Sequence, residues 1–403
     1  MPGPMEGVRV VEIGMWVAGP SAGGMLADWG ADVIKIEPPG GDPIRGVQAV
    51  LGPDVPSNPF FDPDNRAKRS IVLNLRDEDD RATADELIGT ADVFLTNLRP
   101  AALGRLGFGS DTLLARYPRL VYAIVTGYGL TGPDAGVGAY DMGSYWARGG
   151  VADLLSVPGQ QLPTQRSGMG DHFAGMTVAG MISAALFHRE RTGEGQLVST
   201  SLLRVAAYQV SSDFNMKLMI DRDVVYSDRA TEDNPLWNHY RAGDGQAFWL
   251  IGVESDRHWP ALTRLVGRPE WIADERFATR QARKANSATL IAELDALFAE
   301  HPRAEWARRF DAEKDFFWAP VHTVDDVIAD PQTAASGAFV HVTDGSYDRP
   351  MIATPADFHG TPWTVRTRAP RLGEHTEEVR RELAERRTAS RQRRPGELRG
   401  TPS

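Results

Sequence analysis

The chain has 403 residues, no cysteine and a formal net charge of −10. This length suffices for two or three domains, and the absence of cysteine excludes disulfides, thiolate metal sites and a cysteine nucleophile. Because the sequence contains no run of 18 apolar residues and no secretory leader, we expect a soluble, cytoplasmic protein that does not enter a membrane. The acidic charge argues against nucleic acid as a partner.

The first third of the sequence alternates short β-branched runs with helical patterns, which is typical of a parallel sheet covered by helices. Strands are expected at 8–13, 32–37, 70–75, 92–96 and 120–125, and helices at 20–29 and 79–89. Glycines are dense over 127–170, which indicates loops whose backbone lies close to a ligand. A long helix rich in small residues should then run from His172 to Arg189.

The segment 237–330 has a different composition, with tryptophans and helical patterns at 262–266, 290–298 and 303–310. Short strands return at 340–342 and 351–353, so the first domain is expected to be discontinuous. We assign 1–215 and 331–385 to a large α/β domain with a parallel sheet, and 225–330 to a smaller α+β domain with its linkers. Residues 386–403 contain six arginines and one acid, and are expected to be a disordered basic tail.

Several common catalytic motifs are absent. The stretch from Gly14 to Gly24 lacks the G-x-G-x-x-G spacing of a dinucleotide site, and no Walker A sequence occurs. The nine histidines form no metal-binding H-x-x-x-H or H-E-x-x-H pair, and no G-x-S-x-G nucleophile elbow is present. Nicotinamide chemistry, phosphoryl transfer, metal catalysis and serine hydrolysis are therefore poorly supported.

Asp171 is the main catalytic candidate. It lies in the sequence Ser-Gly-Met-Gly-Asp-His over 167–172, directly before the long predicted helix. Aspartate is a good helix N-cap, and that interpretation stays open. Flanking glycines, however, would leave the carboxylate accessible to a bulky electrophile.

Six cationic side chains lie near predicted strand ends and loops. Each alone is typical of a surface ion pair, but together at the carboxyl edge of a parallel sheet they could bind the phosphates of a small ligand. They are Lys35, Arg45, Lys68, Arg69, Arg99 and Arg105.

With these motifs the chain resembles the class III coenzyme A transferase family, which includes formyl-CoA and carnitine CoA transferases and the related α-methylacyl-CoA racemases. The resemblance follows the family's order over nearly the whole chain. The matching stretches are 7–14 with 18–20, 30–38, 65–75, 91–100, 103–107, 126–129, Gly170-Asp171, 191–196 and 372–376.

The resemblance implies a Rossmann-like large CoA-binding domain, a small domain, and two subunits interlocked as rings in a homodimer. Val17 and Pro38 depart from the family pattern, and Lys35 or Arg45 are the candidates to compensate. The positions matched to CoA contacts in the family are Ala18, Lys68, Arg69, Asn97, Leu98 and Arg105.

The resemblance also makes Asp171 the nucleophile that attacks an acyl-CoA thioester, giving an acyl-aspartyl anhydride and then an aspartyl-CoA thioester. Coenzyme A is then a substrate, and neither a metal nor a tightly bound cofactor is needed. Backbone N–H groups around Gly138 or in the small domain would stabilise the oxyanions. An acceptor carboxylic acid finally takes the CoA.

Two other functions stay open. Racemases of this family have a histidine where this chain has Tyr140, and tyrosine is a poor base at neutral pH; His172 is the possible substitute. Transfer is therefore favoured over racemisation, and a non-catalytic CoA-binding protein is the third alternative.

The substrate is less well defined. The stretch 233–241 replaces a glycine-only loop of formyl-CoA transferases, which argues against oxalate. We expect a medium-sized or bulky carboxylic acid. The aromatic candidates for its pocket, each of which would also suit a core, are Trp237, Tyr240, Trp249, Phe316, Phe317 and Trp318.

Overall fold

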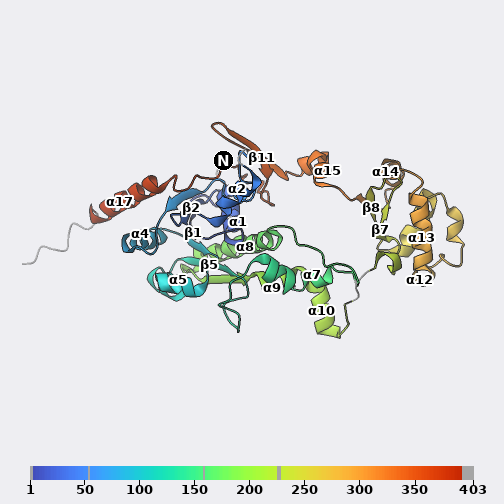
Figure 1. Ribbon diagram of the computed structural model, residues 1–403, viewed down its shortest axis with the longest axis horizontal. Coiled ribbons are helices and arrows are strands. Elements are labelled where there is room, and N and C mark those ends of the chain that lie inside the picture. Colours follow the sequence, from blue (N-terminus) through green and yellow to red (C-terminus); the bar gives the residue numbers. More distant parts are fainter. Residues whose placement is uncertain (1–2, 53–54, 158, 225–227, 393–403) are drawn as a thin grey trace, which may run out of the picture. The chain divides into compact units, whose positions relative to one another are not determined.

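The computed structural model describes residues 3–52, 55–157, 159–224 and 228–392 (Figure 1). The chain forms two compact units. The large unit consists of Met1–Leu154, Pro163–Arg222 and Gly337–Ser403, and the small unit of Leu155–Leu162 and Asp223–Ser336. In the described part of the chain, no helix is long and apolar enough to cross a membrane.

The large unit contains a six-stranded, wholly parallel sheet in the order β3-β2-β1-β4-β5-β6. The parallel sheet predicted from the sequence is confirmed, although its last strand was not predicted. The strand order reverses between β1 and β4, and ligands of such sheets bind at this point. The strands are β1 (Arg9–Ile13), β2 (Asp32–Glu37), β3 (Arg69–Val72), β4 (Val93–Thr96), β5 (Val121–Thr126) and β6 (Leu197–Ser201).

Both faces of this sheet are covered, as the continuous apolar runs of its strands predict. Successive residues point to opposite faces, so Val10 packs in one core cluster and Val11 in the other. The first cluster contains α1 (Ala18–Asp28), α8 (Met169–Thr192) and α9 (Leu202–Gln209). The second contains α4 (Glu78–Ile88), α5 (Pro100–Leu106), α6 (Ser110–Arg116) and α17 (Thr376–Gln392).

Helices α1 and α8 pack against each other unusually closely (Figure 1). A Cβ added at Gly175 of α8 would lie 2.0 Å from Ser21 Oγ of α1. A Cβ added at Gly23 would lie 2.1 Å from the carboxylate of Glu12 on β1. The small residues of both helices therefore set how close α8 lies to the sheet.

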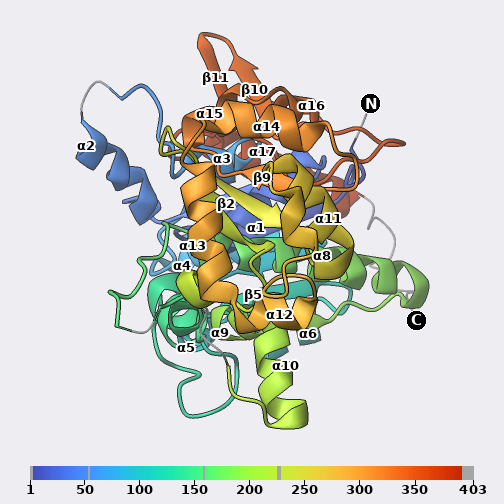
Figure 2. The ribbon, with the colours of Figure 1, turned by 90° about the vertical axis from the view of Figure 1, so that its right-hand side faces the viewer.

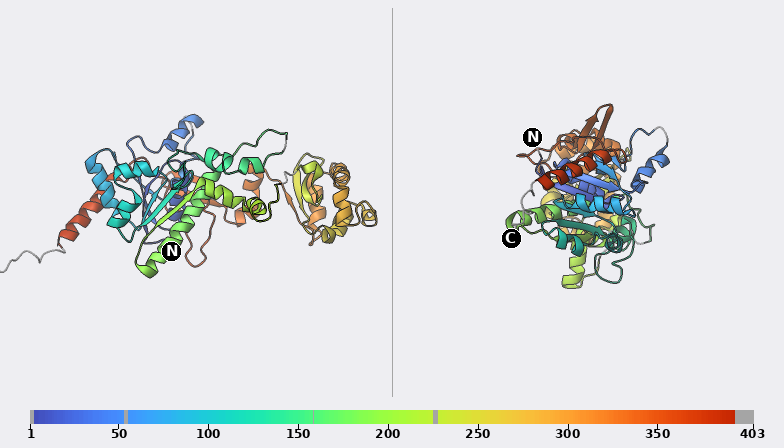
Figure 3. Two further views of the ribbon diagram at one scale, coloured as in Figure 1. Left: turned by 90° about the horizontal axis from the view of Figure 1, so that it is seen from below. Right: turned by 90° about the vertical axis from the view of Figure 1, so that its left-hand side faces the viewer.

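The expectation of a disordered tail from residue 386 is wrong for its first part. Helix α17 continues to Gln392, while 393–403 lie outside the described residues. Arg380 and Arg387 pair with Asp80 and Glu86 of α4, so acidic partners on a neighbouring helix hold this basic segment. Figure 3 shows α17 (red) beside the blue strands of the sheet.

Shorter elements complete the large unit. They are η1 (Pro43–Gly46), α2 (Val47–Leu51), α3 (Asp62–Asn65), the π-helical turn η2 (Met142–Ala147), α7 (Val151–Leu154), α10 (Ser211–Ile220) and the hairpin of β10 (Phe339–Asp344) and β11 (Tyr347–Ile352).

The small unit pairs a three-stranded antiparallel sheet with helices and has its own aromatic core. Helices α11 and α13 face the viewer in Figure 2. Tyr240 and Phe316 are buried in this core, which corrects their assignment to a substrate pocket, whereas Trp237, Trp249 and Phe317 are exposed. The elements are η3 (Arg229–Thr231), β7 (Trp237–Arg241), β8 (Ala247–Ile251), α11 (Ser255–Leu265), η4 (Pro269–Ile272), α12 (Arg280–Ala285), α13 (Ser287–Phe298), α14 (Arg303–Asp311), β9 (Trp318–Pro320), α15 (Val324–Ala329) and α16 (Pro331–Ala335).

Candidate active site

The loop between β1 and α1 lies at the point where the strand order reverses, and hydrogen bonds fix it there. Met15 N donates to Asn97 Oδ1 at 3.0 Å, and Asn97 Nδ2 donates back to Met15 O at 2.7 Å. Trp16 adopts a positive φ of 63°, and its N–H donates to Asp42 Oδ1 at 3.0 Å. Asn97, which is predicted to contact CoA, therefore holds this loop in a defined shape.

Beneath this loop lies a buried ion network centred on Glu12. Its two carboxylate oxygens accept hydrogen bonds from Lys35 Nζ (2.9 Å) and Lys68 Nζ (2.8 Å). Lys35 Nζ also donates to Gly14 O and lies 3.0 Å from Asp42. The side chains of Glu12, Lys35 and Lys68 have no exposed surface. The expectation that these two lysines contact a surface phosphate is therefore corrected: their charges are neutralised inside the unit.

The pKa values within this network follow from burial and neighbouring charges. Burial alone would lower the pKa of Lys35, but the negative charges of Glu12 and Asp42 outweigh burial and raise this pKa. Burial, together with the nearby positive charge of Lys35, lowers the pKa of Lys68 to about 8. For Glu12 the two lysines outweigh burial and lower the pKa. The network thus depends on Glu12 remaining ionised.

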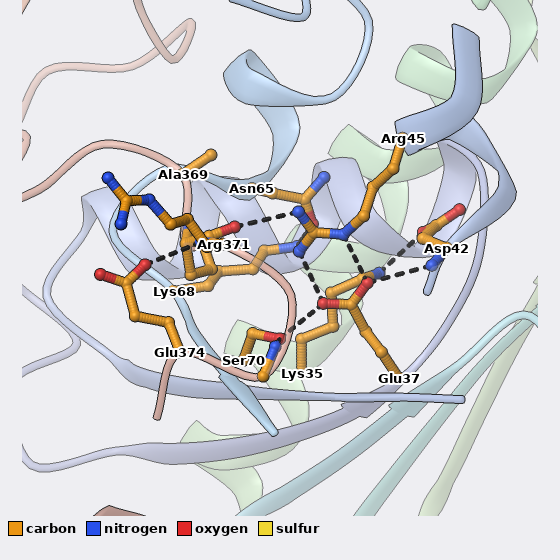
Figure 4. Close-up of polar contacts among 12 residues, drawn as sticks. Lys35, Glu37, Asp42, Arg45, Asn65, Lys68, Ser70, Ala369, Arg371 and Glu374 are labelled. Carbon is orange, nitrogen blue, oxygen red and sulfur yellow. Dashed lines mark hydrogen bonds and ion pairs between the residues drawn. The ribbon is translucent and has the colours of Figure 1, made fainter. Parts of the chain in front are cut away.

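Arg45, the other candidate to compensate at Pro38, is also held by a carboxylate (Figure 4). Its Nε and Nη2 donate to Glu37 at 2.8 and 2.7 Å, and Nη1 donates to Pro370 O. Ser70 Oγ donates to the same carboxylate at 2.6 Å. These donors overcome burial and lower the pKa of Glu37. Arg45 therefore ties the end of β2 to the chain segment that precedes α17.

Arg69 does not lie at the carboxyl edge of the sheet. It is the first residue of β3, so its side chain lies at the opposite, amino edge. There it binds Asp32 at 2.7 Å and Glu382 of α17 at 2.6 Å. Because the strands are parallel, a residue that begins a strand cannot share the edge at which the others end. The grouping of Arg69 with the remaining cations was wrong.

Asp171 lies in a pocket of about 850 Å³ within the large unit. Of the predicted site residues, Tyr140, Asp171 and His172 line it, whereas Gly138 does not. Trp16, Asp64 and Arg66 also line the pocket but were not predicted from the sequence. The full lining consists of Trp16, Val17, Ser21, Gly24, Met25, Ile44, Val47, Pro59, Phe60, Pro63, Asp64, Arg66, Tyr140, Asp141, Met142, Ser167, Gly168, Asp171, His172, Met176, Ile352, Ala353, Thr354 and Pro355.

The Asp171 carboxylate is not a helix cap. Gly168, in the left-handed region at φ 70°, is the N-cap of α8, and Asp171 lies inside the first turn. Among the described residues no hydrogen bond or ion pair holds this carboxylate. Burial, followed by the negative charge of Asp141, raises the pKa of Asp171 to about 7, while His172 opposes this rise. The site therefore holds an unpaired carboxylate of unusually high basicity.

His172 is paired rather than free. Its Nε2 lies 3.3 Å from Asp64 Oδ1 on α3, and the Asp64 contact raises the pKa of His172 to about 8. A Cβ at Gly168 would lie 3.3 Å from the imidazole ring, so that glycine gives the ring its space. At neutral pH His172 thus carries positive charge beside Asp171.

Tyr140 and Asp141 also line the pocket. The Tyr140 ring is 65% exposed and makes an edge contact with Trp16 at 5.7 Å. Asp141 accepts a hydrogen bond from Gln165 Nε2 at 2.7 Å, which fixes its carboxylate. Within the described ranges no three acidic or histidine side chains gather as a metal site.

Comparison with known proteins assigns the family. The sequence profile of CoA-transferase family III matches residues 5–376. The chain belongs to this family. It is 31% identical over 383 residues to cinnamoyl-CoA:phenyllactate CoA-transferase of Clostridium sporogenes, covering 94% of this chain and 93% of that protein. It is 33% identical over 397 residues to succinate–glutarate CoA-transferase of Agrobacterium fabrum, covering 94% of this chain and 96% of that protein.

The crystal structure of a CAIB/BAIF family protein from Brucella suis shares the fold. It superposes with a TM-score of 0.83 at 32% identity, covering 95% of this chain and 100% of that one. Family III CoA-transferases act on CoA thioesters and carboxylic acids, so this enzyme must accommodate a polyanionic CoA moiety.

Three arginines of this CoA-transferase that follow β3 or β4 in the sequence are exposed. Arg76 follows β3, Arg99 follows β4 and Arg105 lies on α5. None of them makes a side-chain ion pair within the described ranges. Arg76 was not among the cations predicted from the sequence, although an arginine shortly after a parallel strand is a signal that could have included it. Leu98 is partly buried against the core, and Ala18 is buried at the start of α1.

We predict that Arg105→Ala raises the KM for acyl-CoA about tenfold and changes kcat little, because a lost charge-assisted contact to phosphate costs about 1.5 kcal/mol or more. Steady-state kinetics with varied acyl-CoA measures this. The matched control is Arg69→Ala, which should lower the thermal stability and leave this KM unchanged. An unaltered KM in Arg105→Ala would remove this arginine from the CoA site.

Proposed function

We propose that the enzyme transfers CoA from an acyl-CoA donor to a free carboxylic acid through covalent intermediates on Asp171. The observation that carries this proposal is the unpaired Asp171 carboxylate in the wall of the 850 Å³ pocket. A carboxylate that is desolvated and unpaired is a stronger nucleophile than one in water. The residue's match to the family's catalytic aspartate supports the same role.

The proposed reaction begins when an Asp171 oxygen attacks the thioester carbonyl carbon. The C–S bond breaks, sulfur leaves with the electron pair as CoA thiolate, and an acyl-aspartyl anhydride remains. The thiolate then attacks the aspartyl carbonyl, which releases the donor acid as a carboxylate and leaves an aspartyl-CoA thioester. The acceptor carboxylate repeats these steps in reverse, and the new acyl-CoA leaves with Asp171 free.

Two further groups are proposed to assist. His172 carries positive charge at neutral pH beside the carboxylate, and would favour the ionised form of Asp171. Backbone N–H groups in the loop containing Gly138 would stabilise the oxyanions. That glycine is exposed, and a Cβ added to it would contact nothing within 4 Å, which is compatible with close approach of a substrate.

We predict that the transfer rate rises with pH through about 7, where Asp171 ionises. His172→Gln removes the positive charge that opposes the raised pKa of Asp171, so the rising limb should move to higher pH. Measuring kcat/KM between pH 5.5 and 9 tests this. A profile that does not move in His172→Gln would contradict the electrostatic role of the imidazole.

Racemisation is the second candidate function. It needs an acid/base group opposite Asp171, and Tyr140 occupies the position where the racemases have histidine. The exposed Tyr140 ring contacts Trp16, and among the residues that the structure describes its hydroxyl has no basic hydrogen-bond partner, which favours transfer.

One experiment separates the three candidates: incubation with acyl-CoAs and free acids in deuterated water, with CoA exchange and α-proton exchange followed together. Exchange of the α-proton without acid-dependent CoA transfer would point to a racemase. Binding of CoA without either reaction would point to a non-catalytic protein.

We also infer a homodimer, which the resemblance implies to be interlocked. Helix α10 supports this inference because it leaves Leu218, Met219 and Ile220 between 66% and 79% exposed. Such apolar surface is usually covered by a partner. Light scattering should give twice the chain mass of 44.1 kDa.

A further inference from the structure

The charges in the pocket wall restrict which acids this CoA-transferase can accept. The titratable side chains there, apart from Tyr140, are Asp64, Asp141, Asp171, Arg66 and His172. Three of them are acidic and two are basic. A second carboxylate of a ligand could be bound only if one of the two basic groups were available.

Neither basic side chain is available. Arg66 is buried and binds Asp28 through Nε and Nη2, the latter at 2.7 Å. Its Nη1 donates to Ile352 O at 2.7 Å. His172 Nε2 faces Asp64 at 3.3 Å. Within the described part of the wall, a second carboxylate of a ligand would thus meet no uncommitted cation.

The rest of the wall is apolar, and it comes from separate elements. Met25 lies on α1, Ile44 on η1, Val47 on α2 and Met176 on α8, while Phe60 precedes α3. Burying a hydrocarbon chain against such a surface is favourable, whereas an ion placed there would lose its hydration without replacement. The volume of about 850 Å³ lies within the range of pockets that enclose medium-sized ligands.

We propose that this pocket takes the hydrocarbon chain of a monocarboxylic acid and rejects acids that carry a second carboxylate. The inference rests on the proposed function, because it assigns to Asp171 the one carboxyl group that reacts. The second carboxylate of a dicarboxylic acid would lie either against the apolar wall or near Asp64 and Asp141. Desolvation opposes the first position, and repulsion between like charges opposes the second.

Self-exchange between an acyl-CoA and its own ¹³C-labelled acid tests this with the full chain. The acids are matched in carbon number: butyrate with succinate, hexanoate with adipate, and octanoate with suberate. We expect kcat/KM for the best monocarboxylate to exceed that for its dicarboxylate partner by about 100-fold or more. Comparable exchange within every pair would overturn the inference.

A charge substitution in the wall provides the second arm. Met176 is 39% exposed, so Met176→Lys can be accommodated and supplies the missing cation. Met176→Lys should reduce the ratio of kcat/KM for the monocarboxylate to that for the dicarboxylate at least tenfold. Met176→Leu, which leaves the charge unchanged, should keep this ratio within about threefold of the wild-type value. An unchanged ratio in Met176→Lys would contradict the electrostatic argument. Absence of exchange with every acid would instead refute CoA transfer itself, and the inference with it.

Discussion

Replacing Asp171 with asparagine should reduce CoA transfer by about four orders of magnitude or more, because the amide cannot attack a thioester and the covalent route is lost. The same substitution should stabilise the folded protein above pH 7. Burial and the charge of Asp141 raise the pKa of Asp171 to about 7, so ionising it costs free energy that asparagine avoids. We therefore expect the catalytic carboxylate to lower the stability of the folded protein.

The sign of this stability effect follows from proton uptake. Asp171 ionises near pH 4 in the unfolded chain and near pH 7 in the folded chain. The contribution of the protonated carboxyl to the free energy of unfolding is therefore fully present below pH 4 and is lost as the pH rises to 7. Asp171→Asn should therefore match the wild type in stability near pH 4 and exceed it by up to about 4 kcal/mol at pH 8. Urea unfolding at both pH values measures the difference.

The matched control is Asp111→Asn on α6, an exposed aspartate in a first helical turn. It should leave the transfer rate unchanged. Transfer at the wild-type rate in Asp171→Asn would show that another group is the nucleophile. Equal unfolding free energies of the variant and the wild type at pH 8 would show that the carboxylate is not desolvated.

Glu12→Gln should be among the most destabilising substitutions that preserve shape. It leaves Lys68 buried without its counterion, with only Pro20 O and Asn65 Oδ1 as acceptors. Removing one partner of a buried ion pair costs about 3–5 kcal/mol. Because the folded pKa of Lys68 is already lowered, the variant should recover stability as the pH is raised from 7 to 10, where the unfolded chain also loses this proton.

Two variants test whether the buried charge causes the loss. Glu12→Gln combined with Lys68→Met should recover most of the lost stability, since no unpaired charge then remains beneath the β1–α1 loop. Glu254→Gln, which removes an exposed partner of Arg257, should cost less than about 1 kcal/mol. Chemical denaturation compares all three. If Glu12→Gln alone were no less stable than Glu254→Gln, the structural role of the buried ion network would be contradicted.

The parallel sheet could be predicted because strands buried on both faces appear as continuous β-branched runs. Strand β6 was missed because Leu197–Ser201 is short and half polar. Sequence reasoning also could not distinguish a buried ionic network from surface cations. For Lys35 a signal existed: it lies inside a run of apolar strand residues, where a lysine needs a buried partner.

The candidate site was predictable in part. Asp171 became a candidate from its glycine-flanked position next to a predicted helix and from the family resemblance, but its surroundings depend on distant residues. Asp64, which holds His172, is separated from it by 108 positions in the sequence. Arg66 was not among the cations predicted from the sequence, and its buried partner Asp28 lies 38 positions away. Pairings of this kind arise from tertiary packing, and a local pattern does not encode them.

The central claim is a covalent intermediate on Asp171, and mass spectrometry of the trapped enzyme tests it most directly. The enzyme is incubated with acyl-CoA, treated with hydroxylamine and digested with trypsin, which should release the peptide 167–189 between two arginines. We predict a hydroxamate at Asp171 that requires acyl-CoA and is absent from Asp171→Asn. Turnover with this peptide unmodified, or modification at another carboxylate, would contradict the account.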